Sequence, residues 1–309
     1  AATEITVLSS SGTGEVMNEA YFGGNMVFSV NTIDGVPKPT FGPAAEALDI
    51  SHLRFPAGQG DAGDLEVDGE GFLNILVMEQ GADGEYELRD ELVSALEWAR
   101  ENDAQLTLVL PTKNYTVAEY EGLDEDIERF AEAVVRDYAD VVEAFEIGNE
   151  YWSMGETAYG SKADVAAGAL ARGMEAAGVE DDDQAAILVQ MASPFAGSEF
   201  HVSIDDRPFA QRVDLANQTI IDQLGDDARD AIDGVVEHYY FDKQVLGFEG
   251  TTGEVNFISR DFSTWDEAFD KELDLYITEW NVRTSTTSET GLRSASVMLE
   301  MTSNMSDLG

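Results

Sequence analysis

Short apolar runs recur along the chain, separated by longer stretches in which apolar residues return every three or four positions. Seven runs are predicted to be buried strands, at residues 22–30, 52–56, 106–110, 141–147, 186–191, 235–240 and 273–278. Several stretches between them have the spacing of an amphipathic helix. Strands that alternate with helices form a parallel sheet with the helices packed outside it. The pattern therefore predicts an α/β fold.

Four of the helical stretches carry an apolar stripe along one face. The stripes are Leu88, Leu92, Ala95, Leu96 and Ala99; Ile127, Phe130, Val134, Val135 and Tyr138; Val165, Ala169, Leu170, Met174 and Ala177; and Val213, Ala216, Ile220, Ile221 and Leu224. Apolar residues at this spacing face the core of a globular protein. We assign these stripes to the core and give them no functional role.

A (β/α)8 TIM barrel is the α/β architecture that fits the length. Such barrels take about 250 residues, and the chain has 309. We expect a barrel catalytic domain over residues 21–309, preceded by an N-terminal segment over 1–20. After the seventh run, residues 291–301 are predicted to be a helix and no eighth strand follows. Either this chain is part of a longer protein, or its barrel is incomplete or completed by a second polypeptide. Residues 4–9 alternate like a strand, which would pair with a C-terminal β domain beyond residue 309.

Two of the apolar runs end in a glutamate flanked by aromatic and amide side chains. Glu150 lies in FEIGNEYW at residues 145–152, and Glu279 lies in YITEWN at residues 276–281. The carboxyl ends of barrel strands carry the functional side chains. We therefore expect the two glutamates to meet at that mouth of the sheet, with carboxyl groups about 5 Å apart.

Two carboxyl groups in different protonation states are what glycosidic bond cleavage requires. One donates a proton to the leaving oxygen, and the other attacks the sugar or activates water. Asn149 can donate a hydrogen bond to a substrate hydroxyl, and Trp152 and Trp280 offer flat apolar faces for sugar rings. The alternative is a pair of surface glutamates, which an acidic chain supplies freely. We favour the catalytic interpretation because both glutamates close an apolar run.

Three further side chains fall at strand ends beside these glutamates. Arg54 ends the second strand, where a cation could hold a carboxyl group ionised; its alternative role is a salt bridge between strands. His238 and Tyr240 share one face of the sixth strand by alternation. The Tyr240 phenol could donate to Glu279, whereas His238 alone would more often be a core histidine. The three histidines are widely separated, so a metal site built on a histidine pair has no support.

Charge excludes several partners. The chain has 62 acidic and 17 basic residues, a formal charge of −45, which repels nucleic acid and anionic membranes. No apolar run approaches a membrane span. The imbalance suits a halophilic setting or a secreted, extracellular protein that binds surface calcium. The Gly- and Asp-rich loop at 58–71 is either a loose calcium site or a solvated acidic loop. A polyanionic substrate would need local cations, for which Lys113, Arg207 and Lys243 are candidates.

The ordered set of motifs resembles clan A of the retaining glycoside hydrolases. The motifs are Arg-Phe-Pro-x-Gly at 54–58, Gly-Asn-Glu at 148–150, His-Tyr-Tyr at 238–240 and Thr-Glu-Trp-Asn at 278–281. The nearest resemblance is to α-L-arabinofuranosidases, β-xylosidases and heparanase-like β-glucuronidases, over residues 50–281. It implies that Glu150 is the general acid/base, Glu279 the nucleophile and Asn149 a donor to the sugar 2-hydroxyl.

The same resemblance implies supporting roles around the nucleophile. Arg54 and Tyr240 would contact it, His238 would line the pocket, and Asn25 would touch the substrate. The arabinofuranosidase-like pattern usually has a second glycine where this chain has Ala57. The expected function is retaining hydrolysis of a poly- or oligosaccharide by an exo-glycosidase without metal or organic cofactor. The alternatives are an endo-acting glycanase and a catalytically silent carbohydrate- or calcium-binding barrel.

Overall fold

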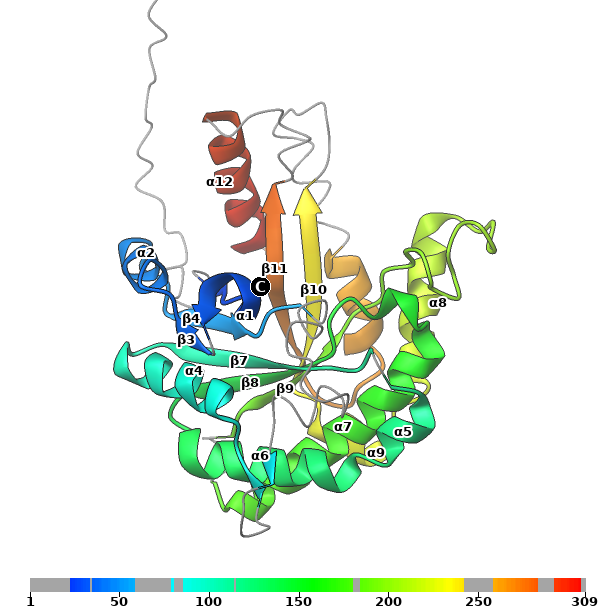
Figure 1. The fold of residues 1–309 in the computed structure, drawn as a ribbon. Helices are drawn as coiled ribbons and strands as arrows, with labels where there is room; N and C mark the ends of the chain where they lie inside the picture. The colour runs from blue at the N-terminus through cyan, green and yellow to red at the C-terminus, as the bar shows by residue number, and fades with distance from the viewer. Residues whose placement is uncertain are drawn as a thin grey trace, which may run out of the picture.

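A seven-stranded sheet organises the protein in a computed structural model, which describes residues 23–33, 35–58, 79–80, 86–113, 115–179, 184–241, 258–282 and 292–306. In spatial order its strands are β1 (Gly23–Asn25), β4 (His52–Phe55), β7 (Gln105–Leu110), β8 (Val142–Ile147), β9 (Ala186–Gln190), β10 (Gly234–Phe241) and β11 (Asp274–Val282). Every neighbouring pair is parallel. Because β1 and β11 also contact each other, the sheet curves into a nearly closed barrel (Figure 1). The expected barrel architecture is confirmed.

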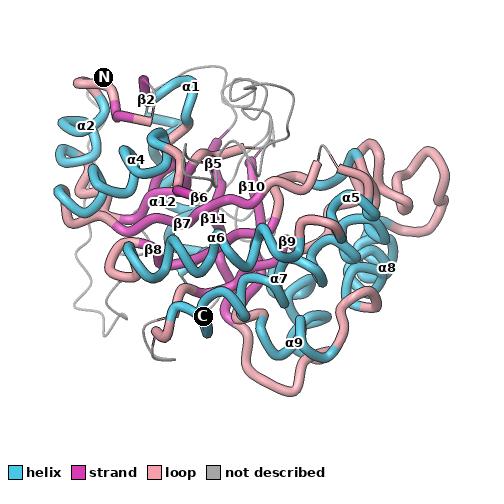
Figure 2. Tube along the Cα trace, turned by 60° about the horizontal axis from the view of Figure 1, so that its bottom comes forward, coloured by secondary structure: helices cyan, strands magenta, loops and turns pink. Residues whose placement is uncertain are grey.

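Helices flank this sheet (Figure 2). The larger ones are α4 (Asp90–Glu101), α6 (Asp124–Tyr138), α7 (Glu156–Ala177), α8 (Phe209–Ile221) and α12 (Leu292–Ser306). The shorter ones are α1 (Phe28–Asn31), α2 (Phe41–Ala47), α5 (Val117–Glu121), η3 (Tyr151–Ser153) and α9 (Asp226–Ala231), and residues 258–266 are also helical. Two hairpins pair β2 (Thr32–Ile33) with β3 (Val36–Pro37) and β5 (Glu79–Gln80) with β6 (Tyr86–Glu87). No described helix is long and apolar enough to cross a membrane.

The apolar stripes explain how these helices pack. In α6 the buried side chains are Ile127, Phe130, Ala131, Ala133, Val134, Val135 and Tyr138, close to the expected stripe. Its first turn carries Asp124, Glu125 and Asp126, and its last turn carries Arg136. Acidic residues at the start and a basic residue at the end of a helix interact favourably with its dipole. Sequence and packing therefore favour the same helix.

Two strand predictions need correction. The run at 22–30 is a strand only as far as Asn25, and Phe28–Asn31 forms helix α1. Polar side chains turn the backbone there, since the Asn31 side chain accepts from the Val27 N–H at 2.8 Å and the Thr32 hydroxyl donates to the Phe28 carbonyl at 2.7 Å. The seventh run extends beyond 278, because β11 continues to Val282. Residues 1–20, the alternating segment 4–9 and the loop at 59–71 lie outside the described residues.

The interior of the barrel is built in layers. An apolar layer consists of Ala144, Leu188 and Val236, all fully buried. Side chains two positions apart on a strand point to the same face. The positions two residues further along these strands therefore form the next layer, which is polar: Glu146, Gln190 and His238. This layer leads to the carboxyl ends of the strands.

Candidate active site

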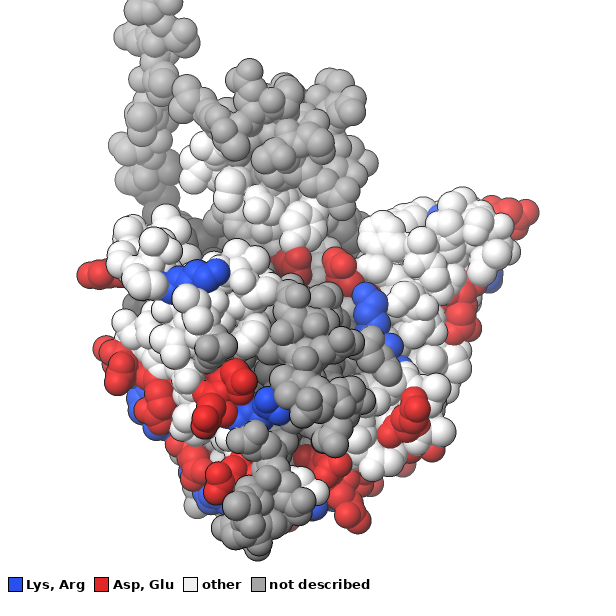
Figure 3. All heavy atoms as spheres, in the orientation of Figure 1, with Lys and Arg blue, Asp and Glu red and all other residues white. Residues whose placement is uncertain are grey.

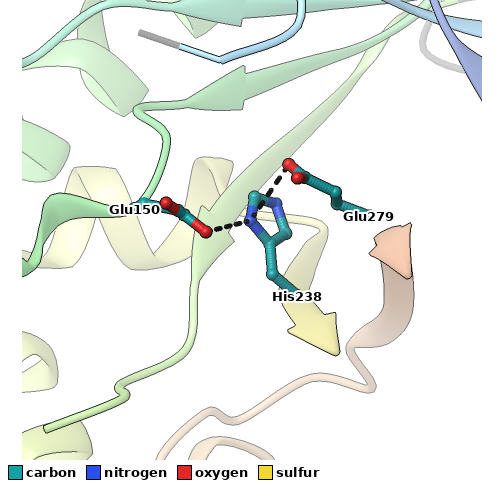
Figure 4. Close-up of side chains that lie close together, drawn as sticks. All are labelled: Glu150, His238 and Glu279. Carbon is teal, nitrogen blue, oxygen red and sulfur yellow. Dashed lines mark ion pairs between the residues drawn. The ribbon is translucent and has the colours of Figure 1, made fainter. Parts of the chain in front are cut away.

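Glu150 and Glu279 lie on either side of His238, a member of the polar layer (Figure 4). Glu150 directly follows the turn after β8, Glu279 lies in β11, and His238 lies in β10. The His238 Nδ1 atom is 3.5 Å from Glu279 Oε2 and 4.0 Å from Glu150 Oε1. One carboxylate oxygen of Glu150, one of Glu279 and one ring nitrogen of His238 all lie within 4.8 Å of one another. Two strand ends that are far apart in sequence thus supply one site.

Backbone conformation and a buried tyrosine set the position of Glu150. Gly148 has φ +79°, and a Cβ there would lie 2.8 Å from Thr112 Oγ1. Glu150 itself has φ 46° and ψ 59°, the left-handed region that non-glycine residues rarely occupy. Its N–H donates to Gln190 Oε1 at 2.7 Å. The Tyr159 hydroxyl donates to the Ile147 carbonyl at 2.6 Å and accepts from the Gln190 N–H at 2.8 Å, which joins β8 to β9 beneath Glu150.

One hydroxyl group and two basic side chains converge on Glu279. The Tyr240 hydroxyl donates to Glu279 Oε1. On the other oxygen, Oε2, the Arg54 Nη1 atom lies at 3.4 Å and the His238 Nδ1 atom at 3.5 Å. The Glu279 side chain is 20% exposed, against 40% for Glu150. The structure therefore brings Arg54, Tyr240 and His238 to the same carboxyl group.

The main partner of Arg54 is Glu146, a buried residue that the sequence prediction missed. Arg54 Nε donates to Glu146 Oε2 at 2.7 Å, and Arg54 Nη2 donates to Glu146 Oε1 at 2.6 Å. Such paired bonds fix both charge and orientation. Arg54 therefore forms a salt bridge between strands and also lies 3.4 Å from Glu279 Oε2. The overlooked signal is a glutamate inside the apolar strand Val142–Ile147.

Arg54 also orients two amides at the site. Its Nη2 atom donates to Asn149 Oδ1 at 2.7 Å, and its Nη1 atom donates to Asn25 Oδ1 at 3.2 Å. Both amide oxygens therefore face the guanidinium. Asn149 is buried and Asn25 is half-buried. Gln190, also unrecognised from the sequence, ends β9 as a buried polar residue after an apolar run.

Burial and charge act against each other in the pKa values here. Burial raises the pKa of Glu146, but the Arg54 guanidinium outweighs it and lowers that pKa to about 2. Burial lowers the pKa of His238, but the carboxylates of Glu146 and Glu150 raise it to about 9. His238 is therefore an imidazolium at neutral pH. Its proximity is the main reason that the pKa of Glu150 is lowered.

The aromatic candidates occupy different positions. Trp152 is half-buried in η3, and its ring contacts Tyr151 and Phe195 edge to face, with centroid distances of 5.0 and 5.4 Å. Trp280 pairs in register with Tyr239 and packs against the main core cluster. By alternation Trp280 lies on the opposite face of β11 from Glu279. Trp152 therefore lies two residues after Glu150 in an aromatic cluster, whereas Trp280 faces away from Glu279.

Two further features concern positive charge: a possible metal site and the basic residues in loops. Glu150, His238 and Glu279 are close enough to share one metal ion, and the proton on His238 would have to leave before that ring could be a ligand. Lys113 is exposed and contributes to lowering the pKa of Glu150. Arg207 is engaged by Asp205, with Nε 2.9 Å from Oδ1, and Lys243 lies outside the described residues.

Ala57 occupies a left-handed backbone conformation with φ 76°. A glycine adopts this region without steric cost, whereas an L-residue pays roughly 1–2 kcal/mol. The conformation explains why the related sequence pattern has glycine at this position.

No protein-family model and no curated protein matches the sequence, but solved structures match the fold. A GH5-4 broad-specificity endoglucanase from Clostridium acetobutylicum aligns with TM-score 0.55 and 12% identity, over 94% of this chain and 85% of that one. The two proteins share the barrel fold. A glucosidase from Croceicoccus marinus has the same fold, with TM-score 0.56 and 13% identity over 94% of this chain and 57% of that chain.

An arabinofuranosidase of family GH51 from Xanthomonas axonopodis pv. citri also shares the barrel fold. It aligns with TM-score 0.50 and 15% identity, over 94% of this chain and 64% of its own. The chain spans 57% and 62% of two further arabinofuranosidase chains. It thus covers less than two thirds of the length of these arabinofuranosidases.

Proposed function

We propose that the protein is a retaining glycoside hydrolase, with Glu279 as nucleophile and Glu150 as general acid/base. The observation that carries the proposal is the approach of one oxygen of each carboxyl group to within 4.8 Å at the end of parallel barrel strands. Retaining glycosidases have carboxyl groups about 5 Å apart, whereas inverting enzymes need a wider gap for water. The shared fold with glycoside hydrolases supports the same function.

The contacts support this division of roles. Glu279 receives a hydrogen bond from Tyr240 and faces the cationic Arg54 and His238. Donors of this kind stabilise a carboxylate, which is the form that attacks a sugar. Glu150 is more exposed and has fewer direct contacts of this kind, so it can reach both the leaving oxygen and an incoming water. In this proposal Asn149, whose oxygen accepts from Arg54, uses its amide group as a donor for a sugar hydroxyl.

The reaction follows two displacements. A Glu279 oxygen attacks the anomeric carbon while the glycosidic C–O bond breaks and Glu150 gives its proton to the departing oxygen. Glu150 then removes a proton from water, which attacks the same carbon and releases Glu279. Since His238 lowers the pKa of Glu150 in the free protein, substrate binding must raise it. A bound sugar does this by excluding water from the carboxyl group.

A panel of aryl glycosides tests the activity, beginning with arabinofuranosides, xylosides and glucuronides. We expect hydrolysis with retention, seen by NMR as first formation of the substrate's own anomer. Glu279→Ala should abolish turnover, and azide should restore it as a glycosyl azide of inverted configuration. Glu150→Ala should lose roughly 10²- to 10⁴-fold on poor leaving groups but spare the first step with a good one. Hydrolysis with inversion would contradict the double displacement.

The matched control is Glu121→Ala, which removes an exposed glutamate from α5. It should keep the wild-type rate. If Glu121→Ala lost as much activity as the two site variants, the losses would reflect general charge rather than the assigned roles. Polysaccharides with blocked ends, tested beside the aryl glycosides, separate the exo-acting enzyme that we propose from an endo-acting one. If the protein bound these carbohydrates but hydrolysed none of them, it would be a catalytically silent carbohydrate-binding barrel.

A further inference from the structure

A line of four aromatic rings leads from the core beneath Glu150 to the surface. Tyr159 stacks on Tyr151 with a centroid distance of 4.4 Å, and Tyr151 contacts Trp152 edge to face at 5.0 Å. Trp152 contacts Phe195 edge to face at 5.4 Å. The first two rings are fully buried, Trp152 is half-buried, and Phe195 is 55% exposed. The line therefore ends in an apolar face open to solvent.

The loop that carries Phe195 is firmly attached. Glu156, fully buried, accepts hydrogen bonds from the Ser198 hydroxyl at 2.6 Å, the Glu199 N–H at 2.8 Å and the Tyr151 hydroxyl at 3.1 Å. A Cβ at Gly197 would lie 2.3 Å from the Trp152 carbonyl oxygen, so the loop packs directly on η3. A ring held in place on the surface is preorganised for stacking, which lowers the entropic cost of binding.

The elements that carry the aromatic pair, Trp152 and Phe195, indicate which of the two glutamates it accompanies. Trp152 follows Glu150 by two residues, and Tyr159, at the buried end of the line, bonds to the Gln190 backbone, whose side chain holds Glu150. Glu279 comes from β11, three strands away from β8 in the sheet. The aromatic pair therefore belongs to the Glu150 side of the site. In the proposed mechanism that is the side of the leaving group, since Glu150 protonates the departing oxygen.

We propose that Trp152 and Phe195 form a binding site for the sugar ring of the leaving group. The proposal rests on the function proposed above and deepens it: the natural substrate carries a second sugar where an aryl glycoside carries its dye. A pyranose or furanose ring presents C–H groups that pack on aromatic faces. Phe195 supplies the exposed face, and Trp152 supports it from the side of Glu150.

The test compares two substrates of the sugar that the aryl-glycoside panel selects: its disaccharide, such as xylobiose for xylose, and its glycosyl fluoride. Fluoride leaves without a ring, so it cannot use the aromatic pair. Phe195→Ala should lower kcat/KM for the disaccharide roughly three- to tenfold and leave the fluoride within about twofold of wild type. Transfer of the glycosyl group from the fluoride to an added monosaccharide acceptor should fall in parallel, while hydrolysis continues. Phe195→Trp should restore both.

The matched control is Phe209→Ala in α8, which removes a phenylalanine that is 53% exposed. This variant should keep the wild-type kcat/KM for both the disaccharide and the glycosyl fluoride. Equal effects of Phe195→Ala on disaccharide and fluoride, or no effect on either, would overturn the leaving-group site while the glycosidase activity stood. A wild-type protein that turned over no glycoside would instead overturn the proposed function, and this site with it.

Discussion

Arg54 and His238 place two cationic groups among three carboxyl groups. Arg54 is committed to Glu146 by two hydrogen bonds, whereas His238 lies 3.4 Å from Glu146 Oε1, 3.5 Å from Glu279 Oε2 and 4.0 Å from Glu150 Oε1. Glu146 thus contacts both cationic side chains, Arg54 and His238, from the polar layer inside the barrel. Removing one partner of a buried ion pair costs roughly 3–5 kcal/mol because a charge is left uncompensated. Glu146 is therefore a positioning residue for the groups that face Glu279.

The charge of His238 can be measured directly. We expect its ring to titrate at about pH 9, since burial lowers its pKa but the carboxylates of Glu146 and Glu150 raise it further. The chain has three histidines, so NMR can follow each ring Cε1–H signal with pH. The signal missing from His238→Gln identifies this residue. A titration of that signal near the ordinary histidine value of about 6.5 would show that the ring is neutral at pH 7.

A second measurement uses the same variant. His238 is the main cause of the lowered pKa of Glu150, so His238→Gln should raise the pKa of the Glu150 carboxyl group. The side-chain carboxyl ¹³C signal, identified by its loss in Glu150→Gln, reports this pKa. If the pKa of Glu150 were unchanged in His238→Gln, the charge of His238 would not act on the Glu150 carboxyl group.

At this scale the sequence predicted the residues at strand ends better than those inside strands. Glu150 and Glu279 stand out because each follows an apolar run, and alternation correctly placed His238 with Tyr240. Glu146 and Gln190 were not recognised, because the pattern shows which face a residue occupies but not which residue on another strand it meets. The contact between Arg54 and Glu146 joins strands 92 positions apart. Such pairing depends on sheet order, which local sequence does not contain.

Among the helices, α6 and α7 make an especially close contact. A Cβ added at Gly173 in α7 would lie 2.3 Å from the Glu128 carbonyl oxygen and 2.6 Å from Ala131 Cβ, both in α6. The missing side chain lets the two helices approach. Gly168 in the same helix has room, since its nearest neighbour would be the flexible Arg172 side chain at 3.4 Å. Replacing each glycine by alanine therefore distinguishes the effect of helix packing on stability from the effect of helix propensity.

Replacing them should change stability in opposite directions. Gly173→Ala should lower the free energy of unfolding by about 1–3 kcal/mol through overpacking. Gly168→Ala should raise it by up to about 1 kcal/mol, because alanine favours the helix over glycine. Urea unfolding of both variants gives the comparison. Equal stability of the two variants would show that α6 and α7 can move apart without cost.

The elements with long periodic patterns were predictable, and the short irregular ones were not. Helices α4, α6 and α8 bury most of their expected stripes. Helix α7 buries Ala169, Leu170 and Met174 of its stripe together with many other positions, because it packs mainly between neighbouring helices. Helix α1 replaces the second half of an expected strand, since side-chain hydrogen bonds over a few residues override the apolar character of 22–30. β11 extends past the apolar run because Glu279–Val282 remain paired with His238–Phe241 of β10.

For the whole molecule, charge is the dominant property. Figure 3 shows acidic side chains over much of the lower part of one face, in keeping with the formal charge of −45. Like charges on a surface repel one another and destabilise the compact state. At molar salt the Debye length falls to about 3 Å, against about 30 Å at 0.01 M. We propose that the protein is adapted to a saline or calcium-containing setting outside the cell.

Thermal unfolding should therefore respond to ions. The midpoint should rise from low salt to molar NaCl through screening, and with millimolar-range calcium chloride through binding to surface carboxylates. Sodium chloride at an ionic strength matched to the calcium sample is the control that distinguishes binding from screening. A midpoint that is the same in all conditions would contradict the hypothesis that surface repulsion limits stability.

The reach of Arg54 has a consequence for the barrel itself. From β4 its guanidinium contacts Asn25 on the first strand, Glu146 on a middle strand and Glu279 on the last described strand of the sheet. The side chains that form the site therefore also link β1 to β11, the two strands at the seam of the barrel. Opening the seam would scatter these groups, and a sugar bound among them would resist opening by mass action. The equilibrium that closes the barrel at this seam is then the same equilibrium that assembles the side chains of the proposed reaction.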